Sequence, residues 1–125
     1  MKSILIIDDD SRNIFALKAV VRAKGYSCFT ATSAEEGLSI LNNHNNEIGI
    51  ILMDMMMPDM DGYEAISVIR KDDGIAEIPI VAVTAQAMVG DREKCLEAGA
   101  DAYLSKPVNV DALMEILTDY IKNDA

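Results

Sequence analysis

The stretch that decides the fold runs from residue 50 to residue 62 and reads Ile50-Ile51-Leu52-Met53-Asp54-Met55-Met56-Met57-Pro58-Asp59-Met60-Asp61-Gly62. Four apolar residues lead into Asp54, and Pro58 and Gly62 then carry the chain out of regular structure. A short apolar run bounded by turn residues is typical of a strand buried on both faces, so Asp54 is predicted at its carboxyl end. In open α/β sheets this edge binds ligands. The function then depends on what the other strands bring beside Asp54.

The rest of the chain alternates strand-like and helix-like segments. Predicted strands cover residues 4–7, 26–31, 48–53, 78–83 and 102–104, with the second at a sheet edge. Predicted helices cover residues 11–24, 33 to the turn near 42–46, 63–71, 88–98 and 109–121. Five strands alternating with five helices indicate an α/β domain over residues 1–125, with a parallel sheet covered on both faces.

Local signals support several of these boundaries. Ser33-Ala34-Glu35-Glu36 reads as a capping box, Asp10 as a cap of the first helix, and Asn109 as the cap of the last. Pro79 is tolerated near the start of the fourth strand. The inner face of the last helix is predicted to contain Leu113, Ile116, Leu117, Tyr120 and Ile121.

Composition narrows the classes of partner. The chain has 11 Lys and Arg against 21 Asp and Glu, a net charge of −10, and 50% of its residues are hydrophobic. This charge repels phosphate backbones and anionic lipid, so we expect no direct binding of nucleic acid or membrane, but a metal cation or a basic partner. We see no signal peptide and no apolar run near the ~20 residues that span a bilayer. Cys28 and Cys95 read as reduced thiols, and we expect a cytoplasmic location.

Polar side chains follow four of the five predicted strands. Asp8, Asp9 and Asp10 follow the first strand, Asp54 the third, Thr84 the fourth and Lys106 the fifth. Carboxylates packed at one edge repel one another unless a cation shares the site. A hard divalent ion, Mg²⁺ or Mn²⁺, matches oxygen ligands of this kind.

This set of side chains fits phosphoryl transfer. Asp54 is the candidate nucleophile and would form an aspartyl phosphate, while Asp8 and Asp9 would hold the metal. Lys106 and Thr84 would contact the other phosphoryl oxygens. The sequence contains no Gly-rich nucleotide loop, so we expect the phosphoryl group to come from another molecule.

The motifs, taken together and in order, resemble the receiver domain of two-component response regulators. They are Asp8-Asp9, Asp54 with Met57-Pro58 and Asp61-Gly62, Thr84-Ala85, Gly99-Ala100-Asp101, and Tyr103 with Lys106-Pro107. Residues 57–63 and 87–98 are most similar to receivers of hybrid sensor kinases. The resemblance implies a flavodoxin-like fold with strand order 2-1-3-4-5.

The resemblance also implies a role for each matching residue. Asp54 would be the phosphoacceptor, with Asp8, Asp9, Asp54 and the backbone carbonyl of Met56 around the metal. Lys106 and Thr84 would contact the phosphoryl group, and Thr84 and Tyr103 would form a switch pair. The peptide bond before Pro107 is expected to be cis.

The resemblance further implies two kinds of protein partner. A histidine kinase or a histidine phosphotransfer domain would donate the phosphoryl group. A downstream protein would bind the surface of the fourth helix, the fifth strand and the last helix. The chain would then be a signalling phosphoacceptor rather than a conventional enzyme, catalysing only its own phosphorylation and slow dephosphorylation.

Two variable positions bear on the lifetime of the phosphorylated state. Met56 lies two residues after Asp54, and Gln86 lies two residues after Thr84. In the family these positions tune self-dephosphorylation, and an apolar Met56 cannot orient an attacking water. We therefore expect a persistent phosphorylated state.

Two other functions are alternatives at this stage. The segment from Ile6 to Ser11 also resembles the opening of haloacid-dehalogenase-type phosphatases, in which Asp8 would be the nucleophile and Asp10 the general acid; Asp54 would then have no role. The other alternative is a docking module that works without phosphorylation. The five methionines from Met53 to Met60 could suggest a Cu(I) site, but packing is favoured.

Overall fold

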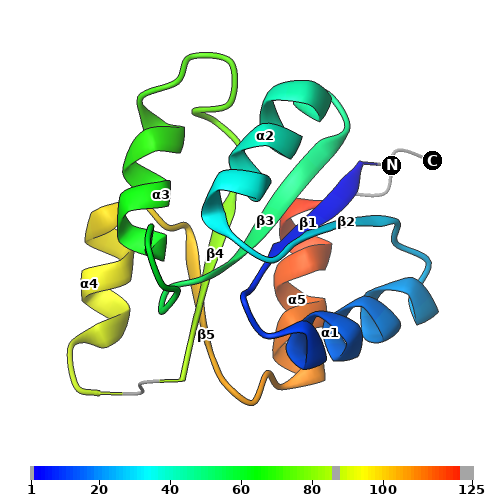
Figure 1. Ribbon diagram of the computed structural model, residues 1–125. Coiled ribbons are helices and arrows are strands. Elements are labelled where there is room, and N and C mark those ends of the chain that lie inside the picture. The colour runs from blue at the N-terminus through cyan, green and yellow to red at the C-terminus, as the bar shows by residue number, and fades with distance from the viewer. Residues whose placement is uncertain (1, 86–87, 122–125) are drawn as a thin grey trace.

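A five-stranded parallel sheet forms the centre of the computed structural model, which describes residues 2–85 and 88–121 (Figure 1). The strand order is β2-β1-β3-β4-β5, as predicted, with β2 at one edge. The strands are β1 (Ser3–Ile7), β2 (Cys28–Ala31), β3 (Ile48–Asp54), β4 (Ile80–Thr84) and β5 (Ala102–Ser105). All four neighbouring pairs are parallel, so every strand ends at the same edge.

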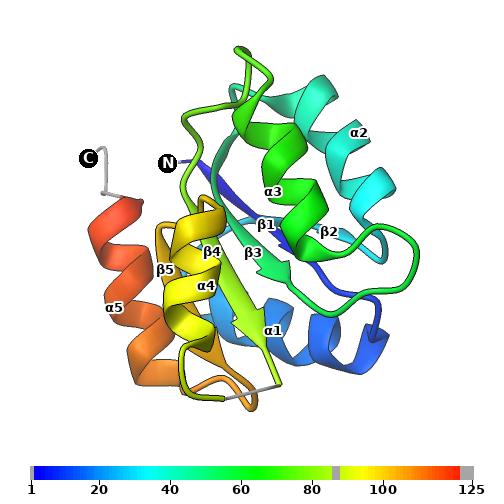
Figure 2. The same ribbon diagram turned by 90° about the vertical axis from the view of Figure 1, so that its left-hand side faces the viewer.

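Five helices cover the two faces of the sheet (Figures 1 and 2). They are α1 (Ser11–Ala23), α2 (Ala34–His44), α3 (Gly62–Arg70), α4 (Asp91–Ala98) and α5 (Val110–Tyr120). Buried residues of α1 and α5 pack in one apolar cluster, and those of α2, α3 and α4 pack in the other. The sheet therefore forms the middle layer of three. Among the described residues, no helix is long and apolar enough to span a bilayer.

Alternation along the strands explains why β3 is apolar from Ile50 to Met53. Ile50 and Leu52 lie in the α1/α5 cluster, whereas Ile51 and Met53 lie in the α2/α3/α4 cluster. Successive side chains of a strand point to opposite faces, so a strand covered on both sides has no polar face. Each such side chain contributes about 1.5–3 kcal/mol when fully buried. This burial fixes β3, and with it the position of Asp54.

Polar caps begin four of the helices. Asp10, Ser33, Asp61 and Asn109 each accept a backbone N–H bond from the first turn of α1, α2, α3 and α5. The predicted capping box of α2 is only half formed, because the Glu36 carboxylate accepts the N–H of Thr32, one residue before the cap. These caps satisfy N–H groups that have no partner within their helix.

The structure corrects three details of the predicted elements. The fourth helix begins at Asp91 rather than Met88, because Gly90 adopts a left-handed φ of +86° that ends the preceding turn. The fourth strand begins at Ile80, after Pro79, which has no N–H to donate. Tyr120 is exposed rather than buried, and its hydroxyl bonds the Asp101 carbonyl at the surface.

Candidate functional site

The carboxyl edge of the sheet brings together the polar residues that follow the strands. Asp54 is the last residue of β3, and Asp8 follows β1, whose Ile7 pairs with Met53. Thr84 is the last residue of β4, and Lys106 follows β5 directly. Because parallel strands end together, the register alone places these four side chains at one edge.

Asp8, Asp9 and Asp54 form an acidic cluster. One carboxylate oxygen from each lies within 4.8 Å of the others. Asp8 and Asp54 are only 2% and 3% exposed, whereas Asp9 is exposed. Buried carboxylates this close need a cation or a proton to offset their repulsion.

Lys106 supplies a cation to this cluster in the structure. Its Nζ lies 3.1 Å from Asp8 Oδ2 and 3.4 Å from Asp54 Oδ2. Burial by itself lowers the pKa of Lys106, but the hydrogen bonds and charges of Asp8 and Asp54 outweigh it, so the net pKa is raised. One ammonium therefore bridges the two buried carboxylates.

Backbone N–H groups hold the second oxygen of each buried carboxylate. The N–H of Asp10 donates to Asp8 Oδ1 at 2.8 Å, and the N–H of Met56 donates to Asp54 Oδ1 at 3.0 Å. In both cases the donor lies two residues after the acid. The backbone that follows each strand thus orients the carboxylate.

Burial dominates the protonation of Asp54. Desolvation, with smaller contributions from the negative charge of Asp8 and from the Asp9 side chain, raises the pKa of Asp54 from 3.8 to about 6. The Met56 N–H and the Lys106 charge act in the opposite direction without overcoming these effects. The site holds more negative charge than its own side chains neutralise.

The donor set fits a hard divalent cation. Three carboxylates converge on one point, and one of them, Asp9, faces solvent, where water could complete the coordination. Mg²⁺ favours a few carboxylate oxygens together with several waters. Asp8, Asp9 and Asp54 could therefore hold such an ion.

Thr84 and Tyr103 lie on the same face of the sheet. Ala82 pairs with Tyr103 and Thr84 pairs with Ser105, so alternation points both side chains toward α3 and α4. Thr84 is 2% exposed. Tyr103 packs against the α2/α3/α4 cluster, and its hydroxyl donates to Asp91 Oδ2 at 3.2 Å.

The loop after Asp54 is fixed by close packing. A Cβ on Gly62 would lie 2.7 Å from the Cα of Met55, so only glycine fits where α3 meets the end of β3. Met55 and Met57 are buried in the core, as packing predicts, but the side chain of Met56 is 53% exposed. The Lys106–Pro107 peptide bond is cis. Gln86 lies outside the described residues.

Sequence reasoning did not find two polar contacts near these elements. It assigned no role to Asp91, the partner of Tyr103, or to Arg70, which bonds the loops at the opposite edge. Asp91 follows a glycine in an acidic helix turn, and Arg70 ends an amphipathic helix, so neither differs locally from an ordinary surface residue. Their partners come from distant segments that only the fold brings close.

Comparisons with known sequences identify the family. A model of the response regulator receiver domain matches residues 4–118. The polar-differentiation response regulator DivK of Brucella ovis is 33% identical over 120 residues, which cover 96% of each chain. The likeness to receivers of hybrid sensor kinases stays a prediction.

Solved structures agree with this result. The Francisella response regulator 1452 receiver domain is 26% identical, with a TM-score of 0.88 and 98% of each chain covered. A co-crystal structure of the Saccharomyces cerevisiae histidine phosphotransfer protein Ypd1 with the receiver domain of its response regulator Ssk1 contains a chain that is 30% identical. Its TM-score is 0.84, and 95% of this chain and 88% of that one are covered.

Proposed function

The chain belongs to the response regulator receiver domain family of two-component signalling, and on this premise we propose that Asp54 is its phosphoacceptor. The observation that carries the proposal is a buried carboxylate at the sheet edge, flanked by Asp8, Asp9 and Lys106. We further propose that residues 1–125 act as a single receiver domain in the cytoplasm. Members of this family are signalling phosphoacceptors.

In the proposed reaction, a carboxylate oxygen of Asp54 attacks phosphorus. An O–P bond forms as the P–N bond to the donor's histidine breaks, and the bonding electron pair stays on the imidazole nitrogen, which takes up a proton. Backbone bonding of Oδ1 to Met56 leaves Oδ2 as the attacking atom. The carboxylate charge of Asp54 is replaced by the negative charge of the phosphoryl group, which nearby cations would have to offset.

Two other side chains would contact the transferred group. Lys106, now bound to Asp54 Oδ2, would follow the negative charge onto a phosphoryl oxygen, and the Thr84 hydroxyl would donate to another. Mg²⁺, or Mn²⁺, held by Asp8, Asp9, Asp54 and the Met56 carbonyl would neutralise the charge of the phosphoryl oxygens. This chain then catalyses only its own phosphorylation and slow dephosphorylation.

A surface beside the site suits a protein donor. A cavity of about 280 Å³ lies between α1 and α5, with Asp8 and Lys106 in its wall. Phe15 on α1 is 76% exposed, and Val110 at the start of α5 is also exposed. Exposed apolar surface can mark a site of protein binding. A histidine kinase or histidine phosphotransfer domain would dock here, and Phe15→Ala should slow transfer from that donor but not from acetyl phosphate.

The output surface would be made by α4, β5 and α5, which lie side by side in Figure 2. Movement of Thr84 toward the phosphoryl group would let the Tyr103 ring turn inward and change this surface for a downstream protein. A Thr84→Ala variant should accept the phosphoryl group but gain less affinity for its target. Equal target binding by wild type and variant would contradict this switch.

The two alternative functions are less well supported. As a phosphatase acid, Asp10 would have to reach a substrate, but its carboxylate caps α1 through the Arg12 N–H and bonds the Arg12 side chain. A docking module without phosphorylation would have no use for a buried Asp54 beside Lys106. The family match also favours the phosphoacceptor.

Phosphorylation by a small donor tests the proposal. The protein is incubated with Mg²⁺ and phosphoramidate, and its intact mass is measured. We expect the mass of one phosphoryl group to be gained by the wild type and by Asp59→Asn, a matched change at an exposed loop acid, but not by Asp54→Asn. A gain that survives Asp54→Asn and is lost on Asp8→Asn would favour the phosphatase, and no gain in a folded wild type would favour the docking module.

A further inference from the structure

The hydroxyl of Tyr103 is held by a side chain of α4. It donates a hydrogen bond to Asp91 Oδ2 at 3.2 Å, in a partly buried position. Asp91 is the first residue of α4, where the helix dipole favours a negative charge. A hydrogen bond to a carboxylate is about twice as strong as one between neutral groups. This contact therefore fixes the orientation of the ring in the unphosphorylated protein.

The position of Tyr103 makes this contact relevant to the site. Tyr103 shares a sheet face with Thr84 and packs against the apolar cluster beneath α2, α3 and α4. Its ring thus lies between the sheet and α4, bonded at its outer end to the helix. Any movement of the ring toward Thr84 must first break the bond to Asp91.

We propose that Asp91 is a positioning residue that holds Tyr103 in its resting orientation and so opposes activation of the receiver. The proposal rests on the proposed function, because it assumes that phosphorylation of Asp54 moves the ring. By linkage, a bond present only in the resting state weakens the binding of any ligand that favours the other state. Removal of the bond should tighten such binding by the same factor.

Binding of beryllofluoride in the presence of Mg²⁺ measures this coupling, since BeF₃⁻ resembles a phosphoryl group on a carboxylate. Asp91→Ala is expected to bind BeF₃⁻ about tenfold more tightly than the wild type, as a hydrogen bond to a charged group predicts. Isothermal titration gives the affinity. Circular dichroism checks that each variant is folded.

Two control variants distinguish the loss of the hydrogen bond to Tyr103 from the loss of negative charge on α4. Asp91→Asn removes the charge but keeps an acceptor for Tyr103, and Glu93→Ala removes a carboxylate from the same turn of α4. Both should stay within about threefold of the wild type, because neither removes the acceptor of the Tyr103 hydroxyl. In the Tyr103→Phe background, Asp91→Ala should change the affinity no further.

The possible outcomes distinguish failure of the Asp91 proposal from failure of the proposed function. An Asp91→Ala affinity that is unchanged, weakened, matched by Glu93→Ala, or still altered in the Tyr103→Phe background would overturn the role of Asp91. A wild type that binds no BeF₃⁻ would instead count against the proposed function. In that case the free energies of unfolding of Asp91→Ala, Tyr103→Phe and the double variant test the contact. If the two single changes in free energy do not add up to that of the double variant, the Asp91–Tyr103 bond is supported. If they do add up, it is refuted.

Discussion

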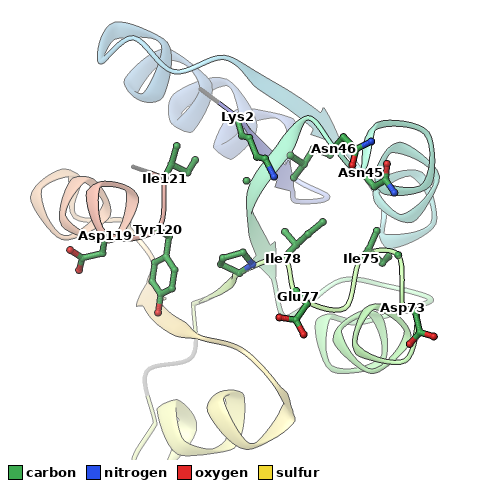
Figure 3. Close-up of a pocket in the computed structure, with 14 residues that line it drawn as sticks. Lys2, Asn45, Asn46, Asp73, Ile75, Glu77, Ile78, Asp119, Tyr120 and Ile121 are labelled. Carbon is green, nitrogen blue, oxygen red and sulfur yellow. The ribbon is translucent and has the colours of Figure 1, made fainter. Parts of the chain in front are cut away.

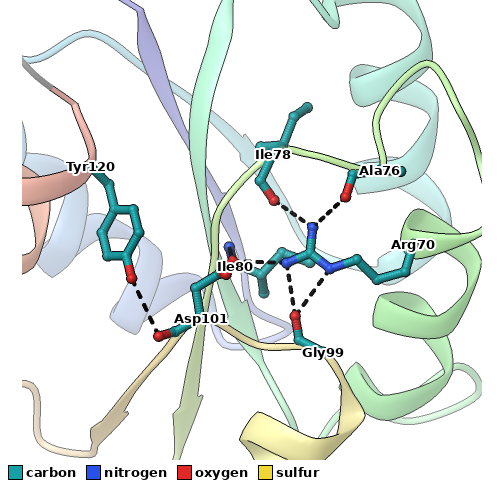
Figure 4. A network of polar contacts seen from close by, with 7 residues as sticks. All are labelled: Arg70, Ala76, Ile78, Ile80, Gly99, Asp101 and Tyr120. Carbon is teal, nitrogen blue, oxygen red and sulfur yellow. Dashed lines mark hydrogen bonds and ion pairs between the residues drawn. The ribbon is translucent and has the colours of Figure 1, made fainter.

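The two edges of the sheet differ in how completely their charged side chains are paired. At the carboxyl edge, Asp9 lies beside Asp8 and Asp54, which share one lysine, and burial helps to raise the pKa of Asp54 to about 6. At the amino edge, one partly buried arginine, Arg70, is surrounded by acceptors (Figure 4). One edge is short of positive charge, and the other has a cation that is fully bonded.

Arg70 joins several segments at the amino edge. Its guanidinium donates to the carbonyls of Gly99, Ala76 and Ile78 and to the Asp101 carboxylate, at distances of 2.8–3.0 Å. Asp101 in turn accepts the N–H of Ile80, at the start of β4. The network ties the end of α3 to the segments before β4 and β5.

The amino edge also has an open cavity of about 550 Å³, but its polar groups do not converge. In Figure 3, Lys2 points into the cavity from one side, whereas Asp73 and Asp119 point away from it at opposite ends. Charged side chains of both signs lie far apart around a cavity that is also lined by isoleucines, so they do not form a reactive centre. The comparison indicates that polar groups at the amino edge stabilise the fold, while those at the carboxyl edge hold buried negative charge that is only partly offset.

The largest change in stability is expected at Arg70. Arg70→Met should lower the free energy of unfolding by about 3 kcal/mol, because three carbonyls and the Asp101 carboxylate lose their bonds to the guanidinium. Arg12→Met is the matched control: the Arg12 side chain is 90% exposed, against 24% for Arg70, so this change should leave the free energy of unfolding nearly unchanged. Urea denaturation measures the free energy of unfolding of both variants. Equal losses would contradict the claim that the Arg70 network stabilises the amino edge.

A change of opposite sign is expected at Asp54. In EDTA at pH 7.5, Asp54→Asn should raise the free energy of unfolding, by up to about 3 kcal/mol for a pKa raised from 3.8 to about 6. Removal of one buried charge relieves the repulsion from Asp8. A destabilised Asp54→Asn variant would show that Lys106 already offsets the cluster.

The same raised pKa predicts a pH dependence. The folded protein binds a proton at Asp54 more readily than the unfolded chain, so this stabilisation is full below about pH 4 and is lost as the pH rises through about 6. The metal-free wild type should therefore become more stable as the pH falls from 7.5 to 5. Asp54→Asn should lack that part of the slope, and parallel curves for the two proteins would contradict the assignment.

The smallest effect is expected at Met56, on the exposed side of the carboxyl edge. Met56→Asn could hydrogen-bond an attacking water, which the exposed thioether cannot do, and should speed phosphate loss about twofold to fivefold. Release of phosphate after removal of the donor gives the rate. Val68→Asn, a change at an exposed apolar residue of α3, serves as the control. Insensitivity to Met56→Asn would mean that this position does not limit hydrolysis.

The carboxyl edge could be predicted from the sequence because its residues follow strands. Asp8, Asp54, Thr84 and Lys106 each lie at or just after the end of a strand, and parallel pairing brings such positions together. Predicting that these side chains lie close together requires no knowledge of side-chain packing. The strand order itself came from the family resemblance.

The contacts that the sequence did not predict depend on how loops and helices pack. The start of α4 at Asp91 depends on the left-handed Gly90, and that start determines which acid meets Tyr103. The acceptors of Arg70 are backbone carbonyls, which every residue carries and no side-chain pattern marks. Periodicity likewise placed Tyr120 inside, whereas its side chain is exposed and the next residue, Ile121, is buried.

The central claim is that Asp54 carries the phosphoryl group, and chemical trapping tests it most directly. Borohydride reduces an aspartyl phosphate to homoserine and leaves free carboxylates unchanged. Trypsin then separates the two candidate regions, because Arg12, Lys18, Arg22 and Lys24 lie between Asp10 and Asp54. We predict homoserine at position 54, within the peptide 25–70, after incubation with phosphoramidate and Mg²⁺. Homoserine at position 8, or an unconverted peptide 25–70 from a phosphorylated protein, would contradict the account.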